Sequence, residues 1–167
     1  MDLRNSSNKV QSQVECRAAG ADEFPAAAEL RAEMALEMGN DFDALSPDWR
    51  PKWCAFFGGK QATGNGQLFL AYDGAVPIGC VVATIPDEYR RACFGIRHAH
   101  VNAVYVKPAF RRQGIARRLM QLIVAWARER DCSRVRLRTS EDGRFLYESL
   151  GFREGREMEL DLSPELH

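Results

Sequence analysis

Apolar residues recur along this chain with two different periods, and the change of period predicts its elements. Spacings of three to four residues indicate helices, whereas short apolar runs bounded by turn residues indicate strands. Helices are expected after Asp22 (stopped by Gly39), after Pro47 (ended by Gly58), from Ile115 and at 143–150. The predicted strands are 14–18, 68–72, 78–84, 98–106 and 135–139, with closing strands at 152 and 158–162.

The order of these elements predicts an α/β fold built on one mixed sheet. Asp73-Gly74 is a hairpin signal between two strands, and the later strands alternate with helices. Strands separated by helices pair in parallel, so we expect parallel pairing in the second half of the sheet. Residues 1–12 are polar and are predicted to be a flexible tail, which leaves 13–167 as one domain.

Composition narrows the class of protein. No apolar run approaches the roughly 20 residues of a membrane span, and five scattered cysteines without CxxC spacing suggest reduced thiols. We therefore expect a cytoplasmic protein that does not bind membranes. Charge is uneven: residues 21–48 carry eight acidic and one basic residue, and residues 101–138 carry ten basic and two acidic. Such asymmetry suits an enzyme that binds a polyanion on one side and a cationic substrate on the other. The alternative is that both charged segments are simply solvated faces.

The segment VYVKPAFRRQGIARRLM holds the strongest candidate chemistry. A strand leads into a turn, and Gly114 allows a tight approach of the backbone to a ligand where the next helix opens. Backbone N–H groups at a helix start favour an anion, and nearby arginines add positive charge. This pattern predicts a pyrophosphate site without the GxxxxGK[ST] of nucleotide-hydrolysing loops. A glycine followed by solvated arginines is the plainer alternative.

Two ordered motifs resemble those of the GNAT superfamily of N-acetyltransferases. Arg111-x-x-Gly114-x-Ala116 is similar to its R/Q-x-x-G-x-G/A signature, and FLYESLGF at 145–152 resembles its second signature. The resemblance covers about 71–162 and implies a single-domain GNAT fold, with splayed parallel strands in a mixed sheet and flanking helices. It also implies acetyl-CoA as co-substrate.

The resemblance assigns the coenzyme contacts to one strand and one loop. Main-chain groups of Val104 and Val106 would bind pantetheine, and a main-chain N–H near Val104 would stabilise the oxyanion. The remaining contacts, mostly to pyrophosphate, would come from Arg111, Arg112, Gln113, Gly114, Ile115, Ala116, Arg117 and Tyr147.

The resemblance also implies catalytic residues, with one departure from the family pattern. Tyr147 would protonate the departing CoA thiolate, although a core tyrosine is the alternative. Many relatives carry a carboxylate on one of the splayed strands, and HAHVNAVYV and VRLRT have none. Candidates for a base or water relay are therefore Asn102, Glu141, His98 and His100. The His98-x-His100 pair lacks a third ligand, so no metal is expected.

The acceptor side is expected on the first two helices. Glu33 and Glu37 share a helical face and, with His100, are the candidate substrate residues for a cationic amine. The sequence thus predicts acetyl transfer to a small-molecule or peptide amine, by direct attack in a ternary complex, by a monomer or homodimer. A non-catalytic acyl-CoA-binding regulatory module is the alternative. Few aromatics accompany the arginines, so nucleic acid is not an expected partner.

Overall fold

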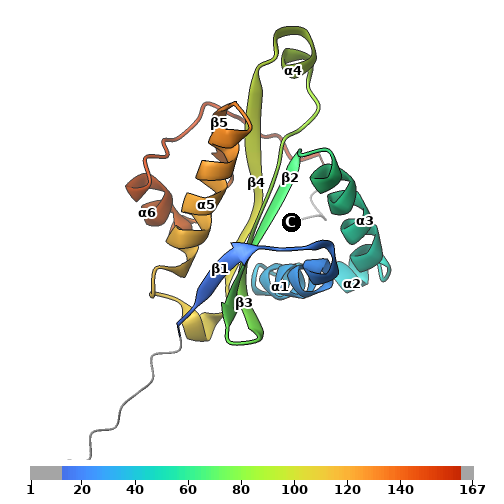
Figure 1. Cartoon of the computed structure of the whole chain (residues 1–167), viewed down its shortest axis with the longest axis vertical. Coiled ribbons are helices and arrows are strands. Elements are labelled where there is room, and N and C mark those ends of the chain that lie inside the picture. Colours follow the sequence, from blue (N-terminus) through green and yellow to red (C-terminus); the bar gives the residue numbers. More distant parts are fainter. Residues whose placement is uncertain (1–12, 163–167) are drawn as a thin grey trace, which may run out of the picture.

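The fold is a five-stranded sheet between two helical layers, in a computed structural model that describes residues 13–162 (Figure 1). The strands lie in the order β1-β2-β3-β4-β5; all neighbours are antiparallel except β4 and β5. The strands are β1 (Glu15–Ala18), β2 (Gly66–Asp73), β3 (Val76–Thr84), β4 (Arg97–Val106) and β5 (Cys132–Leu137). The helices are η1 (Ala21–Glu23), α1 (Phe24–Glu37), α2 (Phe42–Leu45), α3 (Trp49–Ala62), α4 (Tyr89–Phe94), η2 (Pro108–Phe110), α5 (Ile115–Glu129) and α6 (Glu141–Ser149).

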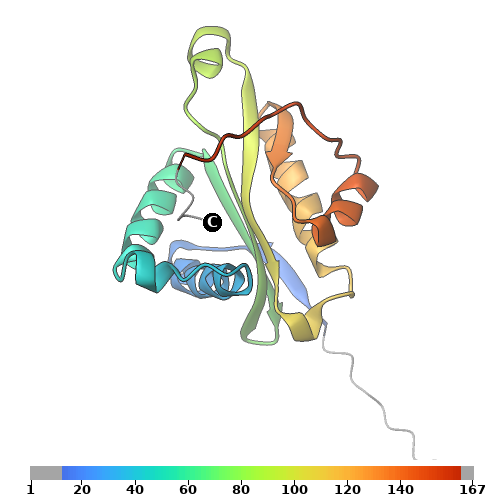
Figure 2. The same ribbon diagram turned by 180° about the vertical axis from the view of Figure 1, so that it is seen from behind.

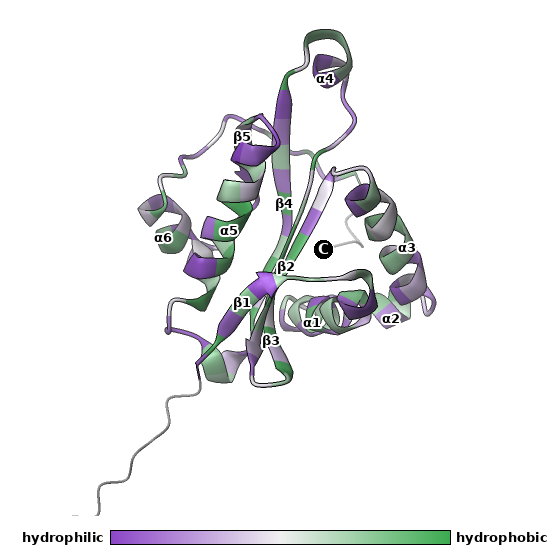
Figure 3. Cartoon of the chain, viewed as in Figure 1, coloured by the Kyte–Doolittle hydropathy of each residue, from purple (hydrophilic) through white to green (hydrophobic). Residues whose placement is uncertain are grey.

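Each face of the sheet carries its own apolar core. Helices α5 and α6 lie on one side and α1, α2 and α3 on the other, as Figures 1 and 2 show from opposite directions. The apolar side of α5 buries Leu119, Met120 and Ile123 against the sheet, while Leu30 of α1 and Phe57 of α3 fill the second cluster. Hydrophobic and hydrophilic residues alternate along α3 and α5 in Figure 3, as expected of helices that cover a sheet.

Most predicted elements are confirmed, and the hairpin at Asp73-Gly74 forms with Gly74 at φ 60°. The prediction that Gly58 ends the second helix was wrong, because α3 continues to Ala62. A Cβ added at position 58 would lie 3.6 Å from the Phe24 ring, an ordinary packing distance inside the helix. The loop at 85–96 contains the short helix α4, which Gly95 closes at φ 66°.

The closing strands predicted at 152 and 158–162 are absent from the described residues, and this prediction was wrong. Residues 152–162 follow α6 without helix or strand, although their apolar and polar residues alternate. A strand needs a partner for its backbone hydrogen bonds, and within the described chain this segment has none. The tail predicted at 1–12 lies outside the described residues.

Candidate active site

The two parallel strands separate where the site is expected. Pairing between β4 and β5 runs from Arg97–Cys132 to Val101–Leu137 and ends there, whereas β4 continues to Val106 paired only with β3. The last part of β4 therefore has an open edge facing away from β3. The predicted splayed strands are confirmed.

A β-bulge lies at the point of separation. Val82 pairs with Ala103 and Ala83 with Val101, so Asn102 is an extra residue opposite β3. The Thr84 hydroxyl donates to the Asn102 Oδ1 at 3.0 Å and holds this side chain. Bulges re-aim the groups of a strand and are frequent beside active sites. No local signal in the sequence predicts this one, since the strand contains no glycine.

The loop before α5 presents unbonded amides to one point. Gly114 has φ 77° and Arg112 has φ 64°, both left-handed, and Gly114 begins a 15-residue helix without a side-chain cap. Within residues 13–162, the N–H groups of 113–117 have no acceptor. Partial positive charge collects at such a helix start, so the loop fits a phosphate group.

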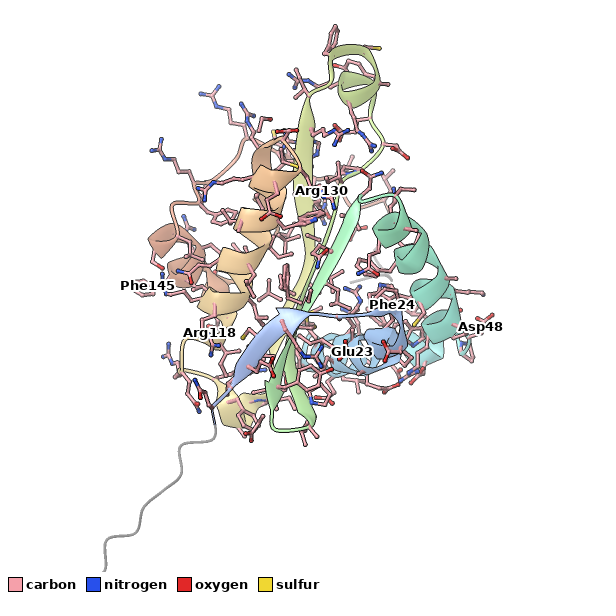
Figure 4. The ribbon with its side chains drawn as sticks, viewed as in Figure 1. Glu23, Phe24, Asp48, Arg118, Arg130 and Phe145 are labelled. Carbon is pink, nitrogen blue, oxygen red and sulfur yellow. The ribbon has the colours of Figure 1, made fainter. Side chains whose placement is uncertain are left out.

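The arginines around this loop differ in what they contact. The Arg111 Nε donates to the Val106 carbonyl at 2.8 Å, and its NH2 group lies 2.7 Å from a Glu37 oxygen. Arg117 donates to the Ser149 hydroxyl at 2.6 Å. Arg118, labelled in Figure 4, donates to the Val14 carbonyl at 2.9 Å. Arg111, a predicted coenzyme contact, therefore ties α1 to the end of β4.

Tyr147 of α6 packs against the core under α5. It also lines a groove of about 1030 Å³ between β5 and residues 152–159, whose lining includes no residue of β4. Its ring packs edge-on against Phe152 at 5.9 Å, and its hydroxyl has no protein partner within the described chain. Burial raises the pKa of Tyr147, which favours the protonated form that a general acid needs.

The three polar residues predicted to relay a proton or contact the acceptor lie on β4 and at the start of α6. Asn102 is the bulged residue, and Glu141 is exposed in the first turn of α6, just after β5. His100 belongs to the next-to-last pair of the parallel strands, with Arg136. Burial, followed by the nearby Arg138, lowers the pKa of His100 and favours its neutral form. His98 instead lies 3.4 Å from a Glu88 oxygen.

Glu33 and Glu37, the predicted substrate residues, contact side chains at and just after the end of β4. The Tyr105 hydroxyl donates to Glu37 at 2.7 Å, and Lys107 lies 3.5 Å from Glu33. The hydrogen bond from Tyr105, followed by that from Arg111, lowers the pKa of Glu37. Both carboxylates are thus engaged by the protein's own groups. Helical spacing placed them correctly on one face, but could not show that β4 supplies their partners.

The described residues contain neither a cluster of metal ligands nor a membrane-spanning helix. Within residues 13–162, no three His, Cys, Asp or Glu side chains gather where they could hold a metal ion. In the same part of the chain, no helix has the length and apolar character required to cross a membrane.

The chain belongs to the acetyltransferase (GNAT) family, whose model matches residues 30–152. The aminoglycoside N(6')-acetyltransferase type 1 of Salmonella typhimurium is 27% identical over 89 residues, which span 52% of this chain and 61% of that protein. This chain therefore aligns with less than two thirds of that relative's length.

Two solved structures share the fold. A predicted acetyltransferase from Clostridium acetobutylicum, determined with acetyl-CoA, has a TM-score of 0.74 at 22% identity, covering 90% of this chain and 97% of that one. AAC(6')-Iy with a CoA-derived bisubstrate analogue has a TM-score of 0.73 at 19% identity, covering 91% and 99%. At these identities the likeness supports the fold and leaves the substrate open.

Proposed function

We propose that this protein transfers the acetyl group of acetyl-CoA to a primary amine by direct attack in a ternary complex. The observation that carries the proposal is the row of unbonded amides at 113–117, beside the open edge of β4. A diphosphate would be held at that helix start, and the extended pantetheine arm would add to the strand edge. Family membership and the acetyl-CoA-bound neighbour support this interpretation.

The coenzyme contacts follow from that placement. Gln113, Gly114, Ile115, Ala116 and Arg117 would donate backbone N–H groups to the pyrophosphate, with the Arg112 guanidinium beside them. Val104 and Val106 would bond the pantetheine amides through their main chain. The Val106 carbonyl already accepts from Arg111, so Arg111 would fix this carbonyl rather than bind phosphate itself.

The reaction requires one proton to leave the amine and another to reach the sulfur. The neutral amine attacks the thioester carbonyl carbon, and a main-chain N–H near Val104 stabilises the oxyanion. The C–S bond then breaks, and the Tyr147 hydroxyl donates its proton to the departing thiolate. The amine proton passes to water held by Asn102 and Glu141, with neutral His100 on the acceptor side. No carboxylate on β4 or β5 takes this role.

The acceptor is a small-molecule or peptide amine, and the aminoglycoside acetyltransferase relative favours a polyamine of that kind. The paired state of Glu33 and Glu37 limits how they can contribute. Each carboxylate would have to bind a cationic acceptor in addition to its present contacts with Tyr105, Lys107 or Arg111.

Calorimetric titration with acetyl-CoA tests the coenzyme site, and a thiol-release assay over a panel of amines tests transfer. We expect saturable binding and amine-dependent release of CoA. No binding at millimolar acetyl-CoA would refute the coenzyme site. Binding without amine-dependent release would favour a second candidate, a non-catalytic acyl-CoA-binding module, which the lack of a strand carboxylate also favours.

A further inference from the structure

Within residues 13–162, five cationic side chains lie over aromatic rings, and Arg31 alone among them has no carboxylate partner. The other four each pair with a carboxylate as well: Arg17, Arg50, Lys60 and Arg111. The Cζ atom of Arg31 lies 5.3 Å from the centre of the Trp53 ring. The Nε and Nη1 atoms of Arg31 are buried, and neither has a hydrogen-bond partner in the described part of the chain.

Arg31 lies in the middle of the face that α1 turns to the sheet. Ala27 and Ala28, one turn earlier, are fully buried, and Ala35, one turn later, is 3% exposed. Burial lowers the pKa of Arg31, an effect that the nearby Cys80 of β3 partly opposes. Buried polar groups in native proteins almost always have partners, because an unpaired one costs free energy. The guanidinium therefore lacks an anion that the folded chain does not supply.

The guanidinium can be reached from one end. Arg31 as a whole is partly exposed, and its third nitrogen, Nη2, is not among the buried unpaired atoms. A guanidinium presents its N–H donors in one plane, as a fork that matches the two oxygens of a carboxylate. A carboxylate that approaches from the Nη2 end is thus the partner that this side chain fits.

The helix that carries Arg31 covers the face of the sheet on which the acceptor is proposed to bind. Cys80 and Val82 of β3 belong to the core beneath α1 and α3, and Thr84 follows them with the same two-residue period. The Thr84 hydroxyl donates to Asn102, so the Asn102 side chain lies on this face as well. A group bound at Arg31 and an amine near Asn102 would be on the same side of the sheet.

Exposed positive charge lines the same face. Val135 and Leu137 of β5 pack against the core under α5, so Arg134 and Arg136 point to the opposite face, where both are exposed. Arg136 is paired in register with His100. The acidic side chains of α1 that contact the end of β4 already have cationic partners. This balance of charge attracts an anionic group and disfavours a polycation, although the aminoglycoside acetyltransferase relative favours a polyamine.

We propose that Arg31 binds a carboxylate of the acceptor, and that the acceptor is an amine that also carries a carboxylate, as amino acids do. The inference rests on the proposed transferase function and names its substrate class. The Arg31 guanidinium would donate hydrogen bonds to the carboxylate while Trp53 holds the guanidinium in place. The amine of the same molecule would extend toward Asn102.

A thiol-release assay with matched acceptors tests the substrate class. The panel contains α- and ω-amino acids, the corresponding amides, the decarboxylated amines and one aminoglycoside. We expect kcat/KM for the best amino acid to exceed that for its amide by about 10–100-fold, the usual factor for one hydrogen-bonded contact to a charged group. Equal or faster transfer to the amides, the decarboxylated amines or the aminoglycoside would refute the inference and leave the transferase function in place.

Arg31→Met removes the charge and keeps much of the side-chain volume. The KM for the amino acid should rise about 10–100-fold while kcat and the KM for acetyl-CoA stay unchanged, because the lost contact is equal in the ground and transition states. Without ligand, the variant should be at least as stable as the native protein, because an unpaired buried charge has been removed. Arg31→Lys keeps the charge without the planar fork and should retain part of the affinity.

Arg50→Met is the matched control. Arg50 also lies over a tryptophan, Trp49, but it pairs with Glu29 and Asp43. The control should therefore leave the KM for the amino acid unchanged. A similar rise of that KM in both variants would show that any change in these helices weakens the acceptor, and would refute the role given to Arg31.

Thermal unfolding with the amino acid, with and without CoA, separates this inference from the transferase function, because it needs no turnover. The amino acid should raise the Tm of the native protein and of Arg50→Met but not that of Arg31→Met, and the matched amide should raise none of them. A carboxylate-dependent rise without acetyl transfer would support the Arg31 site and refute the transferase function alone. No rise in the native protein, or an equal rise in Arg31→Met, would refute the site. An Arg31→Met protein that does not fold would also refute it, because the fold itself would then require the guanidinium.

Discussion

At the scale of single residues, Tyr147 joins local packing to the proposed chemistry. Its ring packs on Phe152, while its hydroxyl has no protein partner within the described chain. Tyr147→Phe should keep the fold and lower kcat roughly 10²–10⁴-fold, the usual loss when a general acid is removed. Thiol-release kinetics measure this, with circular dichroism as the check on folding. An unchanged kcat would show that Tyr147 is a packing residue.

Glu23, labelled in Figure 4, is a second residue whose ionisation can be tested. It accepts from Tyr72 at 2.5 Å, Arg17 at 2.7 Å and the Gly20 amide at 2.9 Å. The hydrogen bond from Arg17, followed by that from Tyr72, lowers its pKa from 4.5 to about 2. The carboxylate therefore stabilises the fold above pH 4.5, and this stabilisation is lost as the pH falls toward 2.

Glu23→Gln should lower the free energy of unfolding at neutral pH by about 1–3 kcal/mol, the range for breaking a hydrogen-bonded charged group. The difference from the native protein should shrink as the pH falls through that window. Urea titrations at several pH values measure both effects. Glu129→Gln, which changes an exposed residue at the end of α5, is the matched control. Equal losses in the two variants would contradict the role given to Glu23.

At the scale of elements, the start of α5 depends on a left-handed residue. Gly114 has φ 77°, and a methyl group added there would meet no atom within 4 Å, so Gly114→Ala would be strained without a clash. Left-handed alanine costs roughly 1–2 kcal/mol. We expect acetyl-CoA affinity to fall about tenfold, the equivalent of 1.4 kcal/mol, as the loop turns its amides away. Calorimetry measures this change.

The control for that prediction is Gly59→Ala in α3, which also has open space but no left-handed φ. It should leave acetyl-CoA affinity unchanged and stabilise the helix by about 0.5–1 kcal/mol. If Gly114→Ala binds as tightly as the native protein, then the loop conformation is not what holds the diphosphate.

At the scale of the whole molecule, the proposed coenzyme site joins the elements that hold the sheet together. Helix α5 packs against all five strands, and β4 contributes to both apolar cores. Acetyl-CoA at 100 times its dissociation constant should stabilise the fold by about 2.7 kcal/mol. For a chain of this size, that corresponds to a rise in Tm of about 5–10 °C. Thermal unfolding with and without the coenzyme measures it, and an unchanged Tm at saturation would argue against a site on these elements.

The sequence by itself determined the elements with strong periodicity and the position of the loop. The period of α5, the hairpin at Asp73-Gly74 and the glycine before α5 are local features, so their physical causes lie within a few neighbouring residues. Parallel pairing late in the sheet followed from the same local pattern, because alternation with helices favours it, and β4 and β5 do pair in parallel. These features were sufficient to predict a mixed sheet with flanking helices, and they indicate the loop that is proposed to bind the anion.

Only the tertiary structure decided the partners of the charged residues and the ends of the strands. Glu37 and Arg111 are 74 positions apart, and their pairing depends on how α1 crosses the end of β4. The bulge at Asn102 arises from register with β3, and the missing closing strands reflect an edge that finds no partner in the described chain. Hydrogen bonds and ion pairs between distant segments depend on packing, so the local hydrophobic period of the sequence does not predict them.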